Sequence, residues 1–325
     1  MAEMNLRQAL SKGLSEALDN NDNVFLMGED IGLYGGPYAV TKDLYKDYGP
    51  DKIIDTPISE SGFVGAAIGS SMVGMKPIVE IMTINFSLLA IDQIVNHAAK
   101  MHYMSDGQLS VPIIIRTVTG AGGRLAATHS QSFEGWYASV PGLKVVAPSN
   151  PNDALGLLRS ALNDNNPIIF VEHSMLYGVT GEVPEPYYET PIGLPKVIQE
   201  GSDLTIIAWS GMIPVAQDVE SKLKEENISC ELIDIRTLNP IEFELIFDSV
   251  KKTNKVVILD EYWETGSFGA YISSVIQENC FDYLDAPISV VNSMNIPMPY
   301  SAELEDQVVP NTKRVLEKIK KIIGL

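Results

Sequence analysis

Residues 55–83 read DTPISESGFVGAAIGSSMVGMKPIVEIMT and join a helix of small residues to a buried strand. Ser59 is typical of a helix N-cap, which places Glu60 in the first helical turn. Glycines inside a helix weaken it by about 1 kcal/mol each relative to alanine. Close packing against another backbone, which small residues permit, must offset that loss. We therefore expect a closely packed helix that directs one carboxylate, followed by a strand over 76–83.

The same alternation of apolar strands and amphipathic helices runs along the whole chain. Continuous apolar strands separated by helices indicate parallel sheets with helices on both faces. A proline-rich stretch with little periodicity, 184–195, marks a linker. The sequence therefore predicts an α/β protein with two doubly wound, mostly parallel-sheet domains, residues 1–190 and 191–325. Further strands are expected at 23–30, 111–120, 168–173, 203–210, 229–237, 255–261 and 288–293, and further helices at 1–20, 86–104, 152–167, 215–227, 243–253, 268–279 and 312–323.

Charge and cysteine content narrow the class of protein. The chain has 42 acidic and 23 basic residues and a net charge of -19, whereas nucleic acids and anionic membranes bind basic surfaces. Its two cysteines, Cys230 and Cys280, are too few for a disulfide framework and fit a reducing compartment. The N-terminal sequence lacks the apolar core of a signal peptide, and no apolar run is long enough to span a bilayer. We expect a soluble intracellular protein that binds neither nucleic acid nor membrane.

Three polar residues are expected near the carboxyl ends of the strands in the first domain, where ligands bind in open parallel sheets. Glu29 lies at the end of one strand, Glu60 begins the small-residue helix, and His129 lies in the glycine-rich loop GAGGRLAATHSQS at 120–132. Their convergence predicts a ligand site at this edge of the sheet.

Several common catalytic motifs do not occur in the sequence. There is no G-x-x-x-x-G-K-[ST] phosphate loop, and GAGGRLA at 120–126 lacks the G-x-G-x-x-G spacing of dinucleotide-binding proteins. The four histidines and two cysteines have no zinc-site spacing, and no G-x-S-x-G element is present. These observations disfavour nucleotide, zinc and serine-hydrolase chemistry.

Six long segments carry a resemblance to a known family. They are GEDIGLYGGPY (28–38), DTPISESGFVGAAIG (55–69), PIVEIMTINF (77–86), AIDQIVNHAAKMHYMS (90–105), THSQSFEGWYASVPGLKVVAPSNPNDA (128–154) and DAPISVVNSMNIPMPYS (285–301). From about residue 4 onward, and in the same order, the chain resembles the beta subunits of thiamine-diphosphate-dependent 2-oxo acid dehydrogenases. Within that family it is most similar to the subunits that act on pyruvate, of the cyanobacterial and plastid type.

The resemblance implies a pyrimidine-binding domain for thiamine diphosphate and a transketolase C-terminal-like domain. It implies oxidative decarboxylation of pyruvate, with acetyl transfer to the lipoyl group of a dihydrolipoyl acyltransferase core, which feeds acetyl-CoA synthesis after glycolysis. In this family two alpha and two beta chains form a heterotetramer and share the cofactor, whose diphosphate and Mg²⁺ are bound by the alpha subunit. This chain has no G-D-G motif for the diphosphate, so we expect activity only with an alpha subunit.

The cofactor-binding positions of the family carry over one by one. Glu60 matches the glutamate that hydrogen-bonds a ring nitrogen of the aminopyrimidine and thereby promotes proton loss from the reactive carbon of the cofactor. Glu29 matches an acid of the same proton network. Phe86 matches the aromatic residue that stacks on the pyrimidine ring, and Ile58 and Met82 match apolar neighbours that exclude water.

The resemblance also implies a second catalytic residue and an ion site. His129 matches a histidine that is credited with proton transfer when the lipoyl group is acylated. In the family, main-chain carbonyls and a carboxylate bind K⁺. The sequence agrees with this, because RSALNDNNP (159–167) ends a helix and leaves carbonyl groups without helical partners. The matching positions are Ile113, Ala161, Leu162, Asp164 and Asn166.

Other functions and contacts stay open at the level of sequence. The chain could instead serve a branched-chain 2-oxo acid dehydrogenase or an acetoin dehydrogenase, or be a non-catalytic assembly subunit. The acidic cluster of Glu303, Glu305 and Asp306 is a candidate contact for the basic subunit-binding domain of the acyltransferase core. The compartment is expected to be a bacterial cytoplasm or a plastid stroma.

Overall fold

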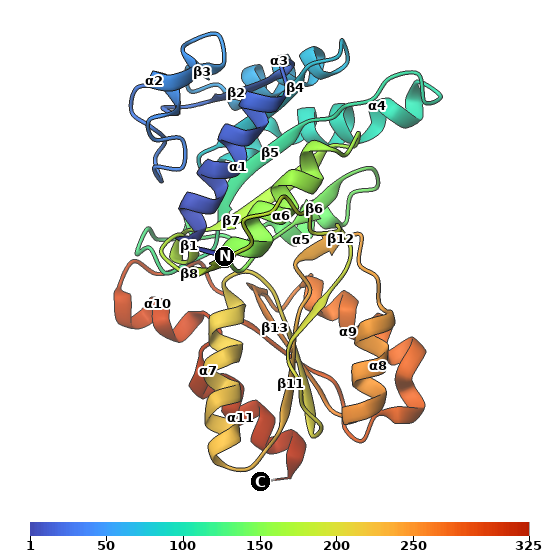
Figure 1. Cartoon of the computed structure of the whole chain (residues 1–325). Coiled ribbons are helices and arrows are strands. Elements are labelled where there is room, and N and C mark those ends of the chain that lie inside the picture. The colour runs from blue at the N-terminus through green and yellow to red at the C-terminus, as the bar shows by residue number, and fades with distance from the viewer. Residues whose placement is uncertain (325) are drawn as a thin grey trace. The chain divides into compact units, whose positions relative to one another are not determined.

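A seven-stranded sheet forms the centre of the first of two units in this computed structural model, which describes residues 1–324 (Figure 1). The neighbours from β6 through to β3 run parallel, as the continuous apolar strands predict. In spatial order the strands are β12 (Thr237–Asn239), β6 (Lys144–Val146), β7 (Ile168–His173), β5 (Ile114–Thr119), β4 (Lys76–Ile81), β2 (Val24–Gly28) and β3 (Ile53–Asp55).

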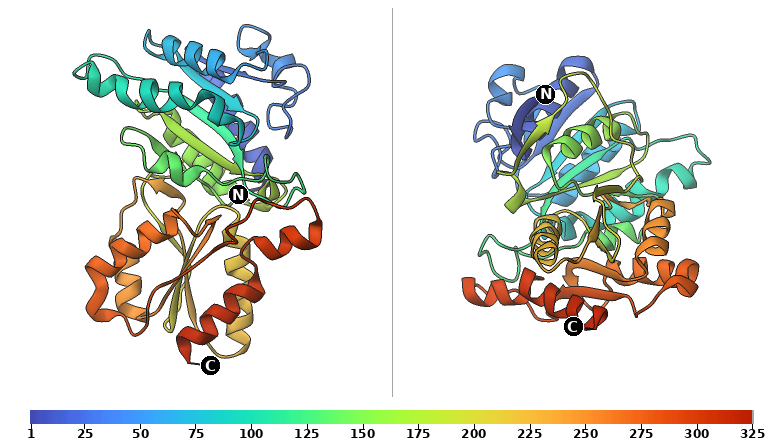
Figure 2. Two further views of the ribbon diagram at one scale, coloured as in Figure 1. Left: turned by 180° about the vertical axis from the view of Figure 1, so that it is seen from behind. Right: turned by 60° about the horizontal axis from the view of Figure 1, so that its bottom comes forward.

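Helices cover both faces of this first sheet. α1 (Leu6–Asn20) and α6 (Pro151–Leu162) pack side by side on one face, and α3 (Glu60–Ser71) packs against β4 on the other (Figures 1 and 2). The four leucines at spacing four in α1 are all buried, which confirms the periodicity seen in the sequence. Burial of each leucine side chain contributes roughly 1.5–3 kcal/mol, so this stripe holds α1 on the sheet.

The segment 86–104 differs from the single helix that its periodicity predicts. It consists of a 3₁₀ turn η1 (Phe86–Ala90), a π-helical segment η2 (Gln93–Ala98) and α4 (Ala99–Met104). Side-chain periodicity does not distinguish these helix types, because tertiary contacts set the local hydrogen-bond spacing. One such contact joins the hydroxyl groups of Ser87 and Tyr137 at 2.5 Å.

The N-terminus begins with a strand that the sequence did not indicate. β1 (Ala2–Asn5) pairs in antiparallel fashion with β8 (Thr180–Val183). Asn5 then caps α1, because its side chain accepts a hydrogen bond from the Gln8 backbone and the Gln8 side chain accepts one in return. The short elements of this region are α2 (Leu44–Tyr48), α5 (Glu134–Ala138) and η3 (Ser174–Leu176).

The second unit is built on a five-stranded sheet. Its strands run parallel except β9, which is antiparallel to β11. Helices α7 and α11 lie on one side of this sheet and α8 and α9 on the other (Figure 1). In spatial order the strands are β14 (Ser289–Ser293), β13 (Val256–Trp263), β10 (Leu204–Ala208), β11 (Cys230–Asp234) and β9 (Lys196–Gln199), and the helices are α7 (Met212–Glu225), α8 (Glu244–Thr253), α9 (Phe268–Cys280), η4 (Phe281–Tyr283), α10 (Ala302–Val308) and α11 (Thr312–Ile323).

The two units are not continuous in sequence. The first comprises residues 1–119, 136–192 and 238–240, and the second comprises 120–135, 193–237 and the chain from 241 onward. The division proposed from the sequence falls between residues 190 and 191. It does not include the two segments 120–135 and 238–240, each of which belongs to the unit on the other side of that boundary.

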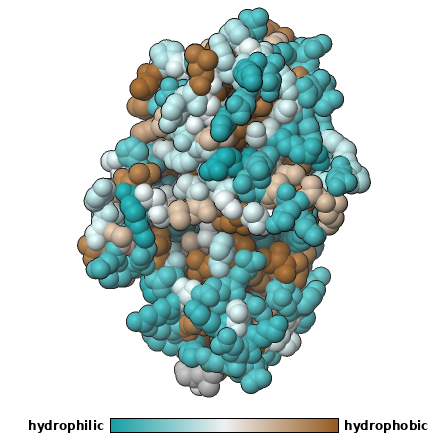
Figure 3. Space-filling view, turned by 60° about the vertical axis from the view of Figure 1, so that its left-hand side comes forward, coloured by the Kyte–Doolittle hydropathy of each residue, from teal (hydrophilic) through white to brown (hydrophobic). Residues whose placement is uncertain are grey.

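Figure 3 shows a face on which hydrophilic residues predominate and hydrophobic ones form small separate groups. Across residues 1–324, no helix combines the length and apolar character needed to cross a membrane.

Candidate active site

Glu60 is the first residue of α3 and is buried, with 3% of its surface exposed. Ser59 occupies the N-cap position, as predicted, and its carbonyl accepts hydrogen bonds from the Gly62 and Phe63 amides at 2.9 and 3.0 Å. The Ser59 hydroxyl makes no capping hydrogen bond within residues 1–324. The helix start is therefore fixed by backbone contacts.

Glu29 follows β2 directly and lies at the same edge of the sheet. Gly28, the last residue of β2, pairs with Asp55 at the end of β3 and with Glu80 near the end of β4. A Cβ atom at Gly28 would lie 2.5 Å from the Glu80 carbonyl oxygen, so glycine is needed for this close approach. The chain then turns at Asp30, whose φ of 56° lies in the left-handed region.

The Glu29 carboxyl group has an unusual environment. It is buried, and within the described part of the chain its Oε1 atom has no hydrogen-bond partner. Burial, together with the charges of Glu60 and Asp30, raises the pKa of Glu29 to about 7. Two buried carboxyl groups in electrostatic contact, one of which holds a proton near neutral pH, form a site that can store and transfer a proton.

Apolar residues follow β4 at this edge. Met82 and Phe86 are both partly buried. The backbone between them is tied to β5, because the Ile84 amide donates to the Val118 carbonyl at 2.8 Å. Ile58, in the loop before α3, is 84% exposed. All five predicted cofactor contacts therefore follow the adjacent strands β2, β3 and β4, and Ile58 presents an apolar side chain to solvent near Glu60.

A buried ion network lies in the strands that lead to this edge. Arg116 of β5 donates to Glu80 of β4 at 2.7 Å and to both carboxylate oxygens of Glu172 of β7 at 2.7 and 2.8 Å. The Tyr177 hydroxyl donates to Glu172 at 2.6 Å. Burial raises the pKa of Glu80, as does the charge of Glu172, and the pairing with Arg116 opposes both effects. We had not predicted this network, although one charged residue inside each of three apolar strands signals it.

His129 lies in the second unit and is exposed. The Thr128 hydroxyl lies 2.9 Å from its Nδ1 atom, and the His129 amide donates to the Ala126 carbonyl at 3.3 Å. The loop around it is closed where the Gly120 amide donates to the Gln131 carbonyl at 3.3 Å. His129 therefore belongs to a structured loop that presents its ring to solvent.

The acidic cluster near the C-terminus is not the open surface that its sequence suggests. Glu305 is fully buried, and its carboxylate accepts hydrogen bonds from the Gly122 amide at 2.9 Å and from Arg124 at 2.6 Å. Asp306 also pairs with Arg124, at 2.8 Å. Glu303 and Asp306 are exposed, so the predicted contact with a basic partner is narrowed to these two acids and stays a prediction.

The predicted ion-site residues lie at the end of α6 and just before β5 and β7. The Ile113 carbonyl accepts a hydrogen bond from the Ile168 amide at 2.9 Å, and the Ala161 carbonyl accepts one from the Asp164 amide at 3.3 Å. The Leu162 carbonyl accepts one from the Lys76 ammonium group at 2.9 Å.

The Asp164 carboxylate is held from two sides. It pairs with the Lys144 ammonium group and accepts hydrogen bonds from the Asn166 amide at 2.8 Å and from the Asn166 side chain at 2.7 Å. Burial alone would raise its pKa, but these contacts outweigh burial and hold the pKa of Asp164 below its usual value. Carbonyl and carboxylate oxygens are the donors that suit K⁺, and carbonyls keep a second lone pair, but the ammonium groups of Lys76 and Lys144 already contact two of these oxygens. Within residues 1–324, no cluster of three or more His, Cys, Asp or Glu side chains is arranged for a metal ion.

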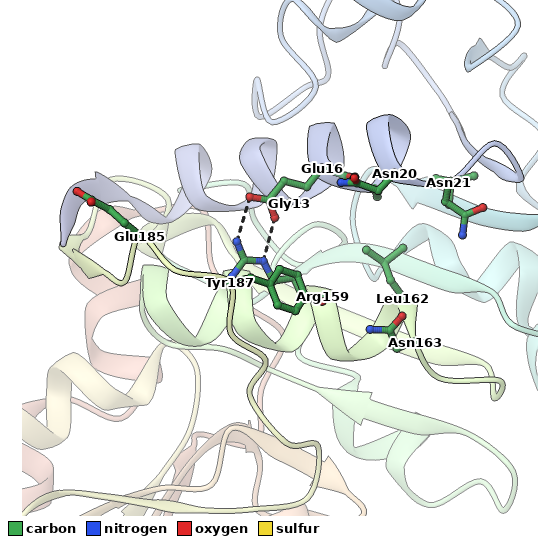
Figure 4. Close-up of a pocket in the computed structure, with 11 residues that line it drawn as sticks. Gly13, Glu16, Asn20, Asn21, Arg159, Leu162, Asn163, Glu185 and Tyr187 are labelled. Carbon is green, nitrogen blue, oxygen red and sulfur yellow. Dashed lines mark hydrogen bonds and ion pairs between the residues drawn. The ribbon is translucent and has the colours of Figure 1, made fainter.

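A pocket of about 430 Å³ lies between α1 and α6 in the same unit (Figure 4). Figure 4 shows Glu16 and Arg159 pointing toward each other across it, joined by hydrogen bonds of 2.9 and 3.0 Å. The Arg159 guanidinium also lies over the Tyr187 ring, 4.7 Å from its centre. Of the predicted site residues, only Leu162 lines this pocket. Neither Glu29 nor Glu60 lines this pocket, so it is a different site from the carboxyl pair at the sheet edge. The charge of Arg159 in the pocket is already balanced by Glu16.

Two domain families match this chain. Residues 2–180 match the family described as transketolase, pyrimidine binding domain, and residues 193–315 match the family described as transketolase, C-terminal domain. The first match contains Glu29, Glu60 and His129. The two matches together account for both sheets.

Curated relatives match the chain over nearly its full length. The pyruvate dehydrogenase E1 component subunit beta of Rickettsia felis is 45% identical over 320 residues, which cover 98% of each chain. The mitochondrial subunit of the same name from Dictyostelium discoideum is 43% identical and covers 98% of this chain and 91% of its own. The Bos taurus mitochondrial subunit is also 43% identical and covers 99% and 91%.

Solved structures show the same fold. A split gene transketolase, named as an inactive beta4 tetramer, has a TM-score of 0.79 with 24% identity and covers 98% of both chains. The transketolase of Campylobacter jejuni has a TM-score of 0.73 with 12% identity and covers 98% of this chain but 47% of its own. At these identities the structures establish the fold, whereas the curated relatives establish the family.

Proposed function

Because this chain belongs to the family of pyruvate dehydrogenase E1 component beta subunits, within the thiamine-diphosphate-dependent transketolase-like proteins, we propose that it contributes half of an active site that decarboxylates pyruvate. The observation that carries this proposal is the buried carboxyl pair of Glu29 and Glu60 at the carboxyl edge of the first sheet. A carboxyl pair of this kind can hold and transfer a proton at a ring nitrogen of a bound ligand.

The proposed reaction has two stages. Pyruvate loses CO₂, and the remaining two-carbon unit is oxidised to an acetyl group while the disulfide of a lipoyl group is reduced. One lipoyl sulfur takes the acetyl group and the other takes a proton. The acetyl group then continues toward acetyl-CoA, and the lipoyl group belongs to a dihydrolipoyl acyltransferase core.

Thiamine diphosphate, when bound, supplies the acidic carbon that attacks the 2-oxo group. Glu60 holds a proton at the aminopyrimidine ring, and Glu29, with its unpartnered oxygen and a pKa of about 7, stores or relays that proton. Phe86, Met82 and Ile58 would cover the ring of the bound cofactor and exclude water. His129 provides the proton that the second lipoyl sulfur takes up.

The rest of the cofactor site belongs to an alpha subunit in this proposal. The chain has no G-D-G motif for the diphosphate and Mg²⁺. Apolar side chains beyond both ends of α3 are exposed in the single chain, with Ile58 at 84% and Val73 at 82%. An alpha subunit that packs along α3 would cover both side chains. We assign this surface to contacts within a heterotetramer of two alpha and two beta chains.

We also assign a K⁺ ion to the oxygens of Ile113, Ala161, Leu162, Asp164 and Asn166. Their donor type supports this assignment, and the ion would order the end of α6. Its role is structural, so no step of the reaction depends on it directly. The compartment of the chain, a bacterial cytoplasm or a plastid stroma, stays a prediction; the relatives named above come from bacteria and mitochondria.

Reconstitution with an alpha subunit tests the proposal. The wild-type pair should decarboxylate pyruvate in preference to branched-chain 2-oxo acids and acetoin, measured with an artificial electron acceptor. Glu60→Gln should lower that rate by at least about 100-fold, which is the usual scale of a lost proton transfer. Glu303→Gln, at an exposed acid, is the matched control. Full activity of Glu60→Gln would refute the role of Glu60, and inactivity of every wild-type pairing would favour an assembly subunit.

A further inference from the structure

The loop that carries His129 contains two residues with strained backbone angles. Arg124 and Ala126 have φ values of 58° and 65°, in the left-handed region that non-glycine residues avoid. Such a conformation is unfavourable for a non-glycine residue and persists only where surrounding contacts fix it. The backbone hydrogen bonds of the loop from Gly120 to Gln131 and from His129 to Ala126 are both long, at 3.3 Å. Other contacts must therefore hold the loop.

Two buried carboxylates of the second unit supply those contacts. Glu261 of β13 accepts a hydrogen bond from the Ala121 amide at 2.7 Å, and Glu305 of α10 accepts one from the Gly122 amide at 2.9 Å. Both glutamates are buried, and Glu305 has no exposed surface. Hydrogen bonds from backbone amides to ionised carboxylates are among the stronger ones in proteins. The start of the loop is thus fixed at two successive amides.

Arg124 completes this attachment and balances its charge. One of its terminal nitrogens donates to Glu305 at 2.6 Å and to the Ala302 carbonyl at 3.0 Å, and the other donates to Asp306 at 2.8 Å. The same carboxylate therefore binds the loop backbone through one oxygen and the Arg124 side chain through the other. Removing the arginine would leave a buried carboxylate without its counter-charge, which is costly.

We propose that Arg124, through Glu305 and Asp306, is a positioning residue that holds His129 for acyl transfer to the lipoyl group. This inference rests on the proposed function. The path from Arg124 to His129 is short. The carbonyl of Ala126, two residues after Arg124, accepts a hydrogen bond from the His129 amide, and the Thr128 hydroxyl lies 2.9 Å from the imidazole Nδ1 atom. A fixed ring lets His129 give its proton to the lipoyl sulfur that leaves the broken disulfide. Decarboxylation precedes that step and does not depend on the loop.

The test uses the complete heterotetramer and separates the two stages. Arg124→Met should lower kcat/KM for acetylation of a lipoyl domain by about 10-fold to 100-fold, the scale that misplacement of a catalytic group by about 1 Å produces. Decarboxylation with an artificial electron acceptor should change less than about twofold. Arg124→Lys should restore part of the acetylation rate, because lysine keeps a charge but cannot bridge both acids as a planar fork. Lys313→Met, at an exposed cation, is the control.

A second readout does not need activity. Amide hydrogen exchange over 120–132 should be faster in Arg124→Met and in Asp306→Asn than in the wild type, while exchange in β10 and β13 stays unchanged. Equal loss of both stages, or unchanged acetylation with unchanged exchange, would overturn the inference. If every wild-type pairing is inactive, the proposed function fails, and faster exchange would still support loop positioning by Arg124. If Arg124→Met does not fold, Asp306→Asn, which leaves Glu305 paired, gives the same comparison.

Discussion

Arg116 and Glu172 form a two-pronged ion pair inside the first sheet, with N–O distances of 2.7 and 2.8 Å. Both side chains are almost wholly buried, and Glu80 completes the network at 2.7 Å from Arg116. Two carboxylates thus share one guanidinium in an environment from which water is excluded. Loss of the arginine would leave both acids without a counter-charge.

Arg116→Met should therefore lower the free energy of unfolding by about 3–5 kcal/mol, measured by urea denaturation. Adding Glu172→Gln to this variant should recover part of the loss, because one buried charge is then removed. Lys313→Met should change stability by less than about 0.5 kcal/mol. An Arg116→Met protein as stable as Lys313→Met would show that the network contributes nothing to stability.

Glu29 predicts a pH dependence of stability with a defined sign. Its pKa in the folded chain is about 7 against an ordinary value of 4.5, so between these values the folded state binds more protons than the unfolded state. The free energy of unfolding should consequently fall as pH rises from about 4.5 to 7, and the penalty should be complete above 7. Other buried acids add their own slopes, so the comparison must isolate Glu29.

The measurement is the urea stability of wild type and Glu29→Gln at several pH values. The difference between the two proteins should grow in favour of the variant from pH 4.5 to 7 and then level off. Glu303→Gln should follow the wild-type curve. Parallel curves for wild type and Glu29→Gln would mean that Glu29 ionises normally in the folded chain.

Local sequence pattern predicted the elements whose burial is continuous. The leucine stripe of α1 and the apolar strands β4, β5 and β7 were identified because each carries its own periodicity. The start of α3 at Glu60 was also predicted, from the N-cap residue Ser59 that precedes it. For these elements the sequence alone contains the determining information.

Long-range contacts account for what the sequence did not predict. Strand β12 is three residues long and belongs to the first sheet, although the neighbouring sequence belongs to the second unit. No local pattern in so short a strand indicates that it pairs with the first sheet. Glu305 has the sequence surroundings of a surface acid, yet it is buried because Arg124, 181 residues away, supplies its counter-charge. The segment 86–104 keeps helical periodicity although its hydrogen bonding changes twice. In each case a tertiary partner decides the outcome.

Substitutions at the glycines of α3 should affect the stability of the free chain and its assembly with an alpha subunit differently. Gly69 is exposed, and a Cβ atom placed there would have no neighbour within 4 Å among the described residues. Gly69→Ala should therefore stabilise the purified chain by up to about 1 kcal/mol. Gly69→Leu should also be tolerated by the free chain, but it should block binding to the alpha subunit, because small residues permit the close approach.

Assembly is measured by size-exclusion chromatography with an alpha partner. Gly178→Leu is the control, since this glycine is also exposed with open space around it and lies outside α3. Gly65→Leu should block assembly as well, but a Cβ atom there already lies 3.2 Å from the Gln93 side chain, so the effect on the free chain is larger. Normal assembly of both leucine variants would remove α3 from the interface.

The ion assignment predicts stabilisation that depends on the kind of cation. K⁺ binds the folded chain only, so its addition should raise the melting temperature relative to tetramethylammonium at equal ionic strength. Asp164→Asn should abolish the difference, because it removes the one carboxylate of the donor set and its pairing with Lys144. Asp51→Asn, at an exposed acid, should retain it. Identical melting temperatures of the wild type in the two salts would show that Lys76 and Lys144 satisfy these oxygens without an ion.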